Sequence, residues 1–246
     1  MKPIKISTDT KLVTNAVNLF YDGKKPGGRW ASWDYCFSYF QEVRSTNPSG
    51  SMAIANAANI SASCQRLHNF LGSWGMLVRG NALSQTSFIV LKPVIGILAN
   101  PASAPVWDLD VDGYFLLNPG TGKWTLSPAA VQLLQLIKPK GLIEKALNAE
   151  FKKVGIKKMA TDTLVTKIVL ATTGSVVGYD KMVKRNTDNL QRSESGLRKI
   201  FDFHQLIAPT VAKLRSPALG CPLDPPLTNQ YCYTRAKVLD MLFTEA

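Results

Sequence analysis

Apolar residues at helical intervals are the feature that most constrains how this chain folds. Between residues 10 and 21 they recur along one face of a helix, at Leu12, Val13, Ala16, Val17 and Phe20. Thr8 or Asp9 can cap the start of this segment, and Gly23 can end it. The spacing therefore predicts one amphipathic helix close to the N-terminus.

The same signals predict helices along most of the remaining chain. Residues 30–40 are rich in aromatic side chains, which are more typical of a core than of a platform for stacking ligands, although both interpretations stay open. Residues 51–70 are rich in Ala and predict one long, closely packed helix, and Pro93 splits a further helical region that ends at Ala99. Ser127 followed by Pro128 is a typical helix start. Further helices are expected over residues 141–153, 161–173, 179–190, 194–214 and about 231–243, with a loop over residues 216–226.

Residues 100–125 interrupt this helical pattern. They contain three prolines and the turn-like sequence Asn-Pro-Gly-Thr-Gly at residues 118–122, so we expect an irregular excursion with a short hairpin near residues 114–117. The fold class expected from the sequence is therefore all-α. We expect residues 1–246 to form a single multi-helix domain with an irregular loop insertion around residues 100–125.

Two further features bear on location. The first nine residues lack the uninterrupted apolar run of a secretory signal, and the apolar stretch over residues 88–99 is broken by Lys92 and Pro93 and is too short to cross a bilayer. We therefore expect a cytoplasmic chain that has no membrane partner.

Positive charge is the strongest global signal for function. The net charge is +12, and residues 138–199 hold 14 Lys and Arg against six Asp and Glu, so this stretch carries +8 of it. Polyanions are the natural partners of such a surface, although exposed Lys residues also simply keep helices solvated. The residues expected to contact nucleic acid or another polyanion are Lys152, Lys153, Lys157, Lys158, Lys181, Lys184 and Arg185.

Several partial motifs lack the residues that their chemistry needs. Asp108, Asp110 and Asp112 resemble the start of a calcium loop, but Pro119 stands where the bidentate Glu belongs, so a solvated acidic loop is expected. Residues 120–123 resemble a P-loop, yet Trp124 replaces the Ser or Thr that would contact magnesium. The four cysteines and two histidines have no zinc-ligand spacing, and the cysteines are expected to be reduced thiols. We therefore expect no metal and no cofactor.

Charged residues flanked by aromatic residues and glycines gather in three segments, at residues 74–80, 178–181 and 231–241. In these segments the chain resembles an uncharacterised family of bacterial hypothetical proteins with no known activity. That family has a Trp-Gly-Met element followed by Arg-Gly, a later Gly and Val before Tyr-Asp, and a C-terminal helix with Lys and Asp-Met. The matching residues are Trp74, Gly75, Met76, Arg79 and Gly80, then Gly174, Val177, Tyr179 and Asp180, then Lys237, Asp240 and Met241.

These segments supply a second set of candidate residues. Arg79 and Lys237 suit a phosphate or carboxylate, and Asp180 and Asp240 can orient them or accept a proton. The candidate ligand-binding residues are Trp74, Arg79, Tyr179, Asp180, Tyr233, Lys237 and Asp240. We expect the four charged groups to converge, either in a ligand pocket or as ion pairs that hold helices together.

Three functions are thus open from the sequence. Binding of nucleic acid or another polyanion ranks first. An enzyme acting on a phosphate-bearing substrate in a pocket around Arg79, Asp180, Lys237 and Asp240 ranks second, and a structural or partner-binding role ranks third.

Overall fold

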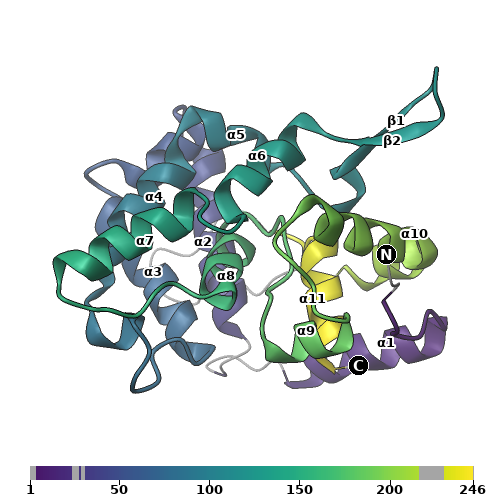
Figure 1. Cartoon of the computed structure of the whole chain (residues 1–246), viewed down its shortest axis with the longest axis horizontal. Coiled ribbons are helices and arrows are strands. Elements are labelled where there is room, and N and C mark those ends of the chain that lie inside the picture. Colours follow the sequence, from purple (N-terminus) through teal and green to yellow (C-terminus); the bar gives the residue numbers. More distant parts are fainter. Residues whose placement is uncertain (1–3, 24–27, 29–30, 216–229, 246) are drawn as a thin grey trace.

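The computed structural model describes residues 4–23, 28, 31–215 and 230–245. Within these residues, regular structure consists of α-helices, short 3₁₀ turns and one two-stranded hairpin (Figure 1), so the all-α prediction is confirmed. The predicted loop over residues 216–226 lies outside the described residues.

The larger group of helices lies on the left and top of Figure 1. The helix α8 lies at its centre and packs against α2, α3 and α6, and every residue from Leu164 to Thr172 is buried. The helix α4 packs against α3 and α7. The bounds are α2 (Ala31–Thr46), α3 (Ile60–Ser73), α4 (Lys92–Ala99), α5 (Ala104–Trp107), α6 (Pro128–Ile137), α7 (Leu142–Lys153) and α8 (Asp162–Thr172).

Four helices form a smaller group on the right, where the N-terminal helix packs against C-terminal ones. The helix α11 contacts the other three, and its residues Ala236 to Phe243 are all buried. The bounds are α1 (Thr10–Gly23), α9 (Lys181–Asn186), α10 (Glu194–Leu214) and α11 (Arg235–Glu245). Residues 173–180 connect α8 to α9, and all of them except Asp180 are buried. This connection joins the two groups.

Several predicted helix starts are present with their caps. The Ser127 hydroxyl accepts a hydrogen bond from the Ala130 amide at 3.1 Å, and Pro128 begins α6. Asp180 caps α9 in the same way through the Val183 amide at 3.0 Å. The expected helix over residues 179–190 is shorter, because Asp188 and Asn189 adopt positive φ angles that a helix does not allow.

The single helix expected over residues 51–70 is wrong. Residues Gly50–Ala55 form a 3₁₀ turn, and α3 begins only at Ile60. Two asparagines account for the break: the Asn56 side chain accepts a hydrogen bond from the Asn59 amide at 2.9 Å, and the Asn59 side chain donates one to the Ala53 carbonyl at 3.0 Å. Such side-chain hydrogen bonds compete with the backbone hydrogen bonds of a helix. The Ala-rich composition of the segment gave no indication of them.

Residues 100–125 are more ordered than an irregular insertion. Val106, Trp107, Val111 and Tyr114 are buried in the core, and short helices and 3₁₀ turns carry them. The strands β1 (Phe115–Asn118) and β2 (Lys123–Leu126) then pair antiparallel, with Phe115 opposite Leu126. The hairpin projects from the body of the protein (Figure 1). The hairpin expected near residues 114–117 overlaps β1, but the observed hairpin extends to Leu126, and the burial of Val106, Trp107 and Val111 was not expected.

The described helices share one continuous buried cluster, which contains Trp33, Phe37 and Phe40 from the aromatic run. The core interpretation of that run is therefore confirmed for these three residues. Cys36 and Cys64 are buried free thiols and Cys232 is an exposed one, whereas Cys221 lies outside the described residues. Among the described residues, no single helix is both long and apolar enough to cross a membrane, and only a pair bent by 70°, Phe88–Ala99 with Pro101–Trp107, has the length and composition to do so.

Candidate functional site

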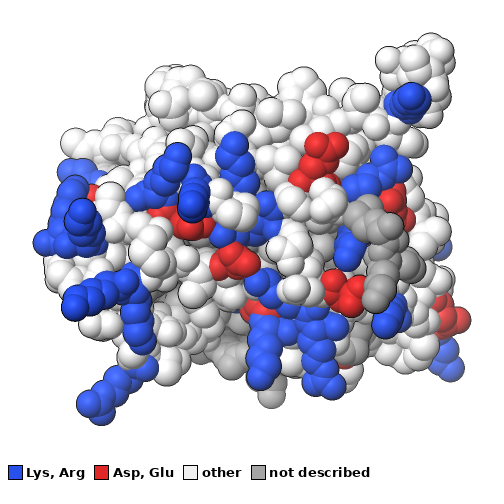
Figure 2. All heavy atoms as spheres, viewed as in Figure 1, with Lys and Arg blue, Asp and Glu red and all other residues white. Residues whose placement is uncertain are grey.

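The Lys and Arg residues predicted to bind a polyanion are on the surface. Figure 2 shows two main groups of them on one face, the first over the end of α7 and the segment that follows it, the second over α9, with acidic side chains between the groups. We call this the basic face and define it by Lys152, Lys153, Lys157, Lys158, Lys181, Lys184 and Arg185.

The seven side chains of the basic face differ in how they are paired. Lys153 forms an ion pair with Glu150 at 2.5 Å, and Lys184 forms one with Asp162 at 2.7 Å. The Lys158 ammonium donates a hydrogen bond to the carbonyl of Gly80. The other four form no side-chain hydrogen bond or ion pair with the described residues, and they are Lys152, Lys157, Lys181 and Arg185. These four cations are therefore available to an anion.

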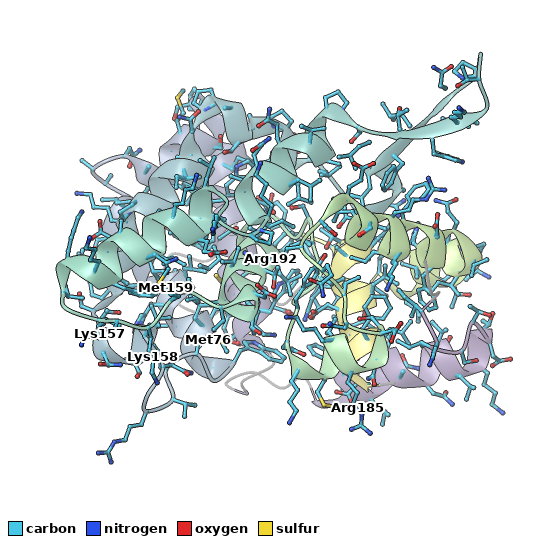
Figure 3. The ribbon with its side chains drawn as sticks, in the orientation of Figure 1. Met76, Lys157, Lys158, Met159, Arg185 and Arg192 are labelled. Atoms are coloured by element: carbon cyan, nitrogen blue, oxygen red, sulfur yellow. The ribbon has the colours of Figure 1, made fainter. Side chains whose placement is uncertain are left out.

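Two cations of the basic stretch are instead buried, and sequence reasoning missed both. The Arg192 guanidinium, which lies at the centre of Figure 3, contacts Glu144 and Asp162, each at 2.7 Å, and donates to the carbonyl of Ile137 at 2.7 Å. These bonds link α6, α7 and α8. Burial alone would raise the pKa of Asp162, but the hydrogen bond from Lys184 and the charge of Arg192 hold it below its ordinary value.

The second buried cation is Lys167, whose ammonium pairs with Asp180 at 3.0 Å. A parallel pair lies beside it: the Lys237 ammonium contacts Asp240 at 3.0 Å, and the other oxygen of Asp240 accepts a hydrogen bond from the Gly178 amide at 2.8 Å. Gly178 separates the two pairs, because a side chain there would meet both Asp240 and Lys167 within 3.3 Å. The two Lys–Asp pairs therefore tie α8, the 173–180 connection and α11 together.

Aromatic rings enclose both ammonium groups. Lys167 lies 4.7 Å from the centre of the Trp74 ring, and Lys237 lies 5.4 Å from the same ring and 4.5 Å from that of Phe20. Such contacts stabilise a cation that has left water. Burial nevertheless lowers the pKa of Lys237 below its ordinary value of 10.5, and the neighbouring Asp240 opposes that shift.

Two tyrosines of the candidate set are fully buried next to this network. The Tyr233 hydroxyl donates to the carboxylate of Asp34 at 2.6 Å, and Asp34 is itself buried. The Tyr179 hydroxyl is buried, and in the part of the chain that the structure describes it has no hydrogen-bond partner. Burial raises the pKa of both phenols, so neither ionises near neutral pH.

Arg79 does not join the group that the sequence predicted around it. Asp180, Lys237 and Asp240 lie together with Trp74, whereas Arg79 is exposed and forms no ion pair or hydrogen bond with the described residues. It belongs to an exposed turn over residues 78–80, and the contact from Lys158 to Gly80 ties this turn to the segment after α7. Arg79 therefore extends the basic face and does not line a shared pocket.

The sequence contains a signal that singles out Lys167. Lys167 is the only charged residue between Leu164 and Thr172 in an otherwise apolar or hydroxyl-bearing run, and a charge in such a segment must find a partner. Asp34 in the aromatic run carries the same signal. The sequence thus indicates that these two charged residues need partners, but the partners lie far away along the chain.

The acidic loop is not simply solvated. The Asp110 carboxylate caps α11, because it accepts hydrogen bonds from the Arg235 amide at 2.8 Å and the Ala236 amide at 3.0 Å. Asp108 pairs with Arg44 at 2.8 Å, and Asp112 pairs with Arg235 at 3.2 Å. Among the described residues no group of three or more His, Cys, Asp or Glu side chains is arranged to hold a metal ion.

Two cavities border the basic face. The larger, about 560 Å³, lies between the N-terminal segment, α1, α9 and α11, and Arg185 lines it. The smaller, about 280 Å³, lies between the segments that follow α3 and α7. Figure 3 shows its residues Met76, Lys158 and Met159 in one region, with Lys157 next to them.

Comparison of the chain with protein-family models, with curated proteins and with solved structures finds no match. The resemblance that the three short segments suggest therefore stays a prediction. Fold and surface together define the class of protein, an all-α chain with a basic face.

Proposed function

We propose that this chain binds a polyanion, with nucleic acid as the first candidate, through its basic face. The observation that carries the proposal is the set of four exposed and unpaired cations, which are Lys152, Lys157, Lys181 and Arg185. An exposed cation without an internal partner can take a phosphate without first breaking an ion pair. Arg79 adds a fifth such group.

The net charge of +12 supports the same proposal, because a surface of one sign attracts and steers a partner of the opposite sign. Phosphate contacts supply most of the affinity in non-specific binding of nucleic acid. The proposal includes the sequence-based expectation that the chain acts in the cytoplasm.

Charge-neutralising variants test the proposal. Replacing Lys152, Lys157, Lys181 and Arg185 together by Ala should weaken binding of a fluorescent oligonucleotide by at least about tenfold, measured by anisotropy at fixed salt. The matched control replaces Lys11, Lys92, Lys123 and Lys213, four exposed cations outside residues 138–199. Equal losses in the two variants would mean that net charge alone attracts the ligand, and the basic face would lose its role.

A further inference from the structure

The smaller cavity beside the basic face has an apolar interior. Its floor is formed by Leu83 and Leu164, which are 1% and 4% exposed. Met76 lines it from the segment after α3, and Met159, which is 63% exposed, lines it from the segment after α7. Methionine side chains adapt their shape and make favourable contacts with flat aromatic rings.

A few polar groups of the cavity are still able to bind a ligand. The Asn81 side-chain amide donates to the Gly75 carbonyl at 3.2 Å, but its oxygen accepts no hydrogen bond from the described residues. The Thr161 hydroxyl accepts a bond from the Leu164 amide and keeps its own hydrogen to donate. An apolar hollow with a small number of acceptors and donors is the usual form of a small-molecule site. Asn81 and Thr161 suit the edge of a heterocyclic base.

The charges around the cavity select an anionic ligand. Lys158 lines it, and none of the described residues that line it is acidic. Lys157 and Lys152 are exposed and unpaired on the same segment and the helix before it, and Arg79 is exposed on the facing turn. A ligand that fits this site therefore combines a flat, largely apolar ring with negative charge, as a nucleotide unit does.

A strand fits better than a free nucleotide or a duplex. A second group of cations, which includes Lys181 and Arg185 on α9, lies beyond the acidic side chains that separate the two groups (Figure 2), so there are more cations than one phosphate can use. In a duplex, the bases are stacked and paired inside the helix and cannot enter a hollow in a protein surface unless they are flipped out. Single strands expose their bases at no such cost.

We propose that the cavity between Met76 and Met159 receives one unstacked base of a single-stranded nucleic acid, whose phosphates lie along the basic face. This inference rests on the proposed function and adds to it the class of polyanion. It distinguishes a single strand from a duplex and from polyphosphate, which has the charge but no base.

The test compares three probes on the same protein by fluorescence anisotropy or competition. These are a single-stranded oligonucleotide, the duplex of the same sequence and inorganic polyphosphate. Met159→Ala should weaken binding of the single strand by about two- to tenfold, as expected for losing a sulfur–ring contact, and leave polyphosphate binding unchanged. The matched control is Met182→Ala, since Met182 is 42% exposed on α9 of the same face but does not line the cavity. Met159→Phe, which restores a stacking surface, should restore the affinity for the single strand.

The outcomes separate the two proposals. If the wild type binds none of the three probes, the proposed function fails, and the base pocket fails with it. If the wild type binds polyphosphate but prefers the duplex to the single strand, or if Met159→Ala and Met182→Ala behave alike, only the base pocket is overturned. Tight binding of adenosine monophosphate without any gain from a longer strand would also overturn it, in favour of a mononucleotide site.

Discussion

Lys237 illustrates how a single buried charge depends on its partner. Its side chain is 1% exposed, and its ammonium group has Asp240 at 3.0 Å and rings of Phe20 and Trp74 around it. An isolated charge in such a place is costly, whereas a paired one is tolerated. Removing one member of the pair is therefore costly, because it leaves the other charge buried without its partner.

Lys237→Met should lower the free energy of unfolding by about 3–5 kcal/mol, because the Asp240 carboxylate is then buried with the Gly178 amide as its one remaining hydrogen-bond partner among the described residues. Urea unfolding measures the change. The double variant Lys237→Met with Asp240→Asn removes both charges and should be less destabilised than the single variant. If Lys237→Met lowers the free energy of unfolding by less than about 1 kcal/mol, the Asp240 carboxylate is not buried as the structure shows.

His204 makes stability depend on pH. It is 2% exposed, both of its ring nitrogens are buried without a hydrogen-bond partner among the described residues, and burial lowers its pKa below 6.5 despite the nearby Asp112 and Asp110. The unfolded chain therefore binds a proton at a higher pH than the folded one, and stability is lost as pH falls below about 6.5.

His204→Leu should reduce the loss of unfolding free energy between about pH 7 and pH 5, measured by urea titration at each pH. His68 is the other histidine, and burial lowers its pKa too. The same measurement on His68→Gln therefore gives the part of the pH dependence that comes from His68. If the pH dependence is unchanged in His204→Leu, the neutral buried imidazole is not what sets it.

At the scale of elements, Asp110 fixes the start of α11. Its carboxylate accepts hydrogen bonds from the first two amides of the helix and carries the negative charge that a helix N-terminus favours. Asp110→Ala should therefore cost about 1–2 kcal/mol of stability in thermal or urea unfolding. Asp108→Ala is the matched control, because its side chain is 75% exposed and its ion pair with Arg44 should contribute under about 1 kcal/mol. Equal effects of the two substitutions would contradict the capping role.

Most helices could be predicted because their signals are local. Ser127-Pro128 begins α6 as expected, and the apolar face of residues 10–21 forms α1. The break before α3 could not be predicted, because it depends on which backbone groups the Asn56 and Asn59 side chains form hydrogen bonds with. The first part of residues 100–125 was expected to be irregular because of its prolines. Pro101 and Pro105 instead lie in the first turns of two short helices with buried residues.

At the scale of the whole molecule, the arrangement of the helices was out of reach of the sequence. The helix α1 packs against α10 and α11 from the other end of the chain, and no periodicity encodes that choice. For the same reason, the four charged residues that we expected to converge do not all lie in one place. Asp180, Lys237 and Asp240 did come together, but Lys167 occupies the position that we assigned to Arg79, and Arg79 lies on the surface. A residue's type shows that it needs a partner, and only the fold decides which partner it receives.

The central claim is that exposed cations of the basic face bind phosphates, and the salt dependence of binding tests it most directly. A protein that neutralises phosphates releases their counterions, so the logarithm of the binding constant falls linearly with the logarithm of salt concentration, by about 0.7 per phosphate on a single strand. Four contacts, from Lys152, Lys157, Lys181 and Arg185, give a slope of about −3. We predict a line of that steepness in an anisotropy titration from about 50 to 200 mM salt. Tight binding with a slope near zero would contradict the account.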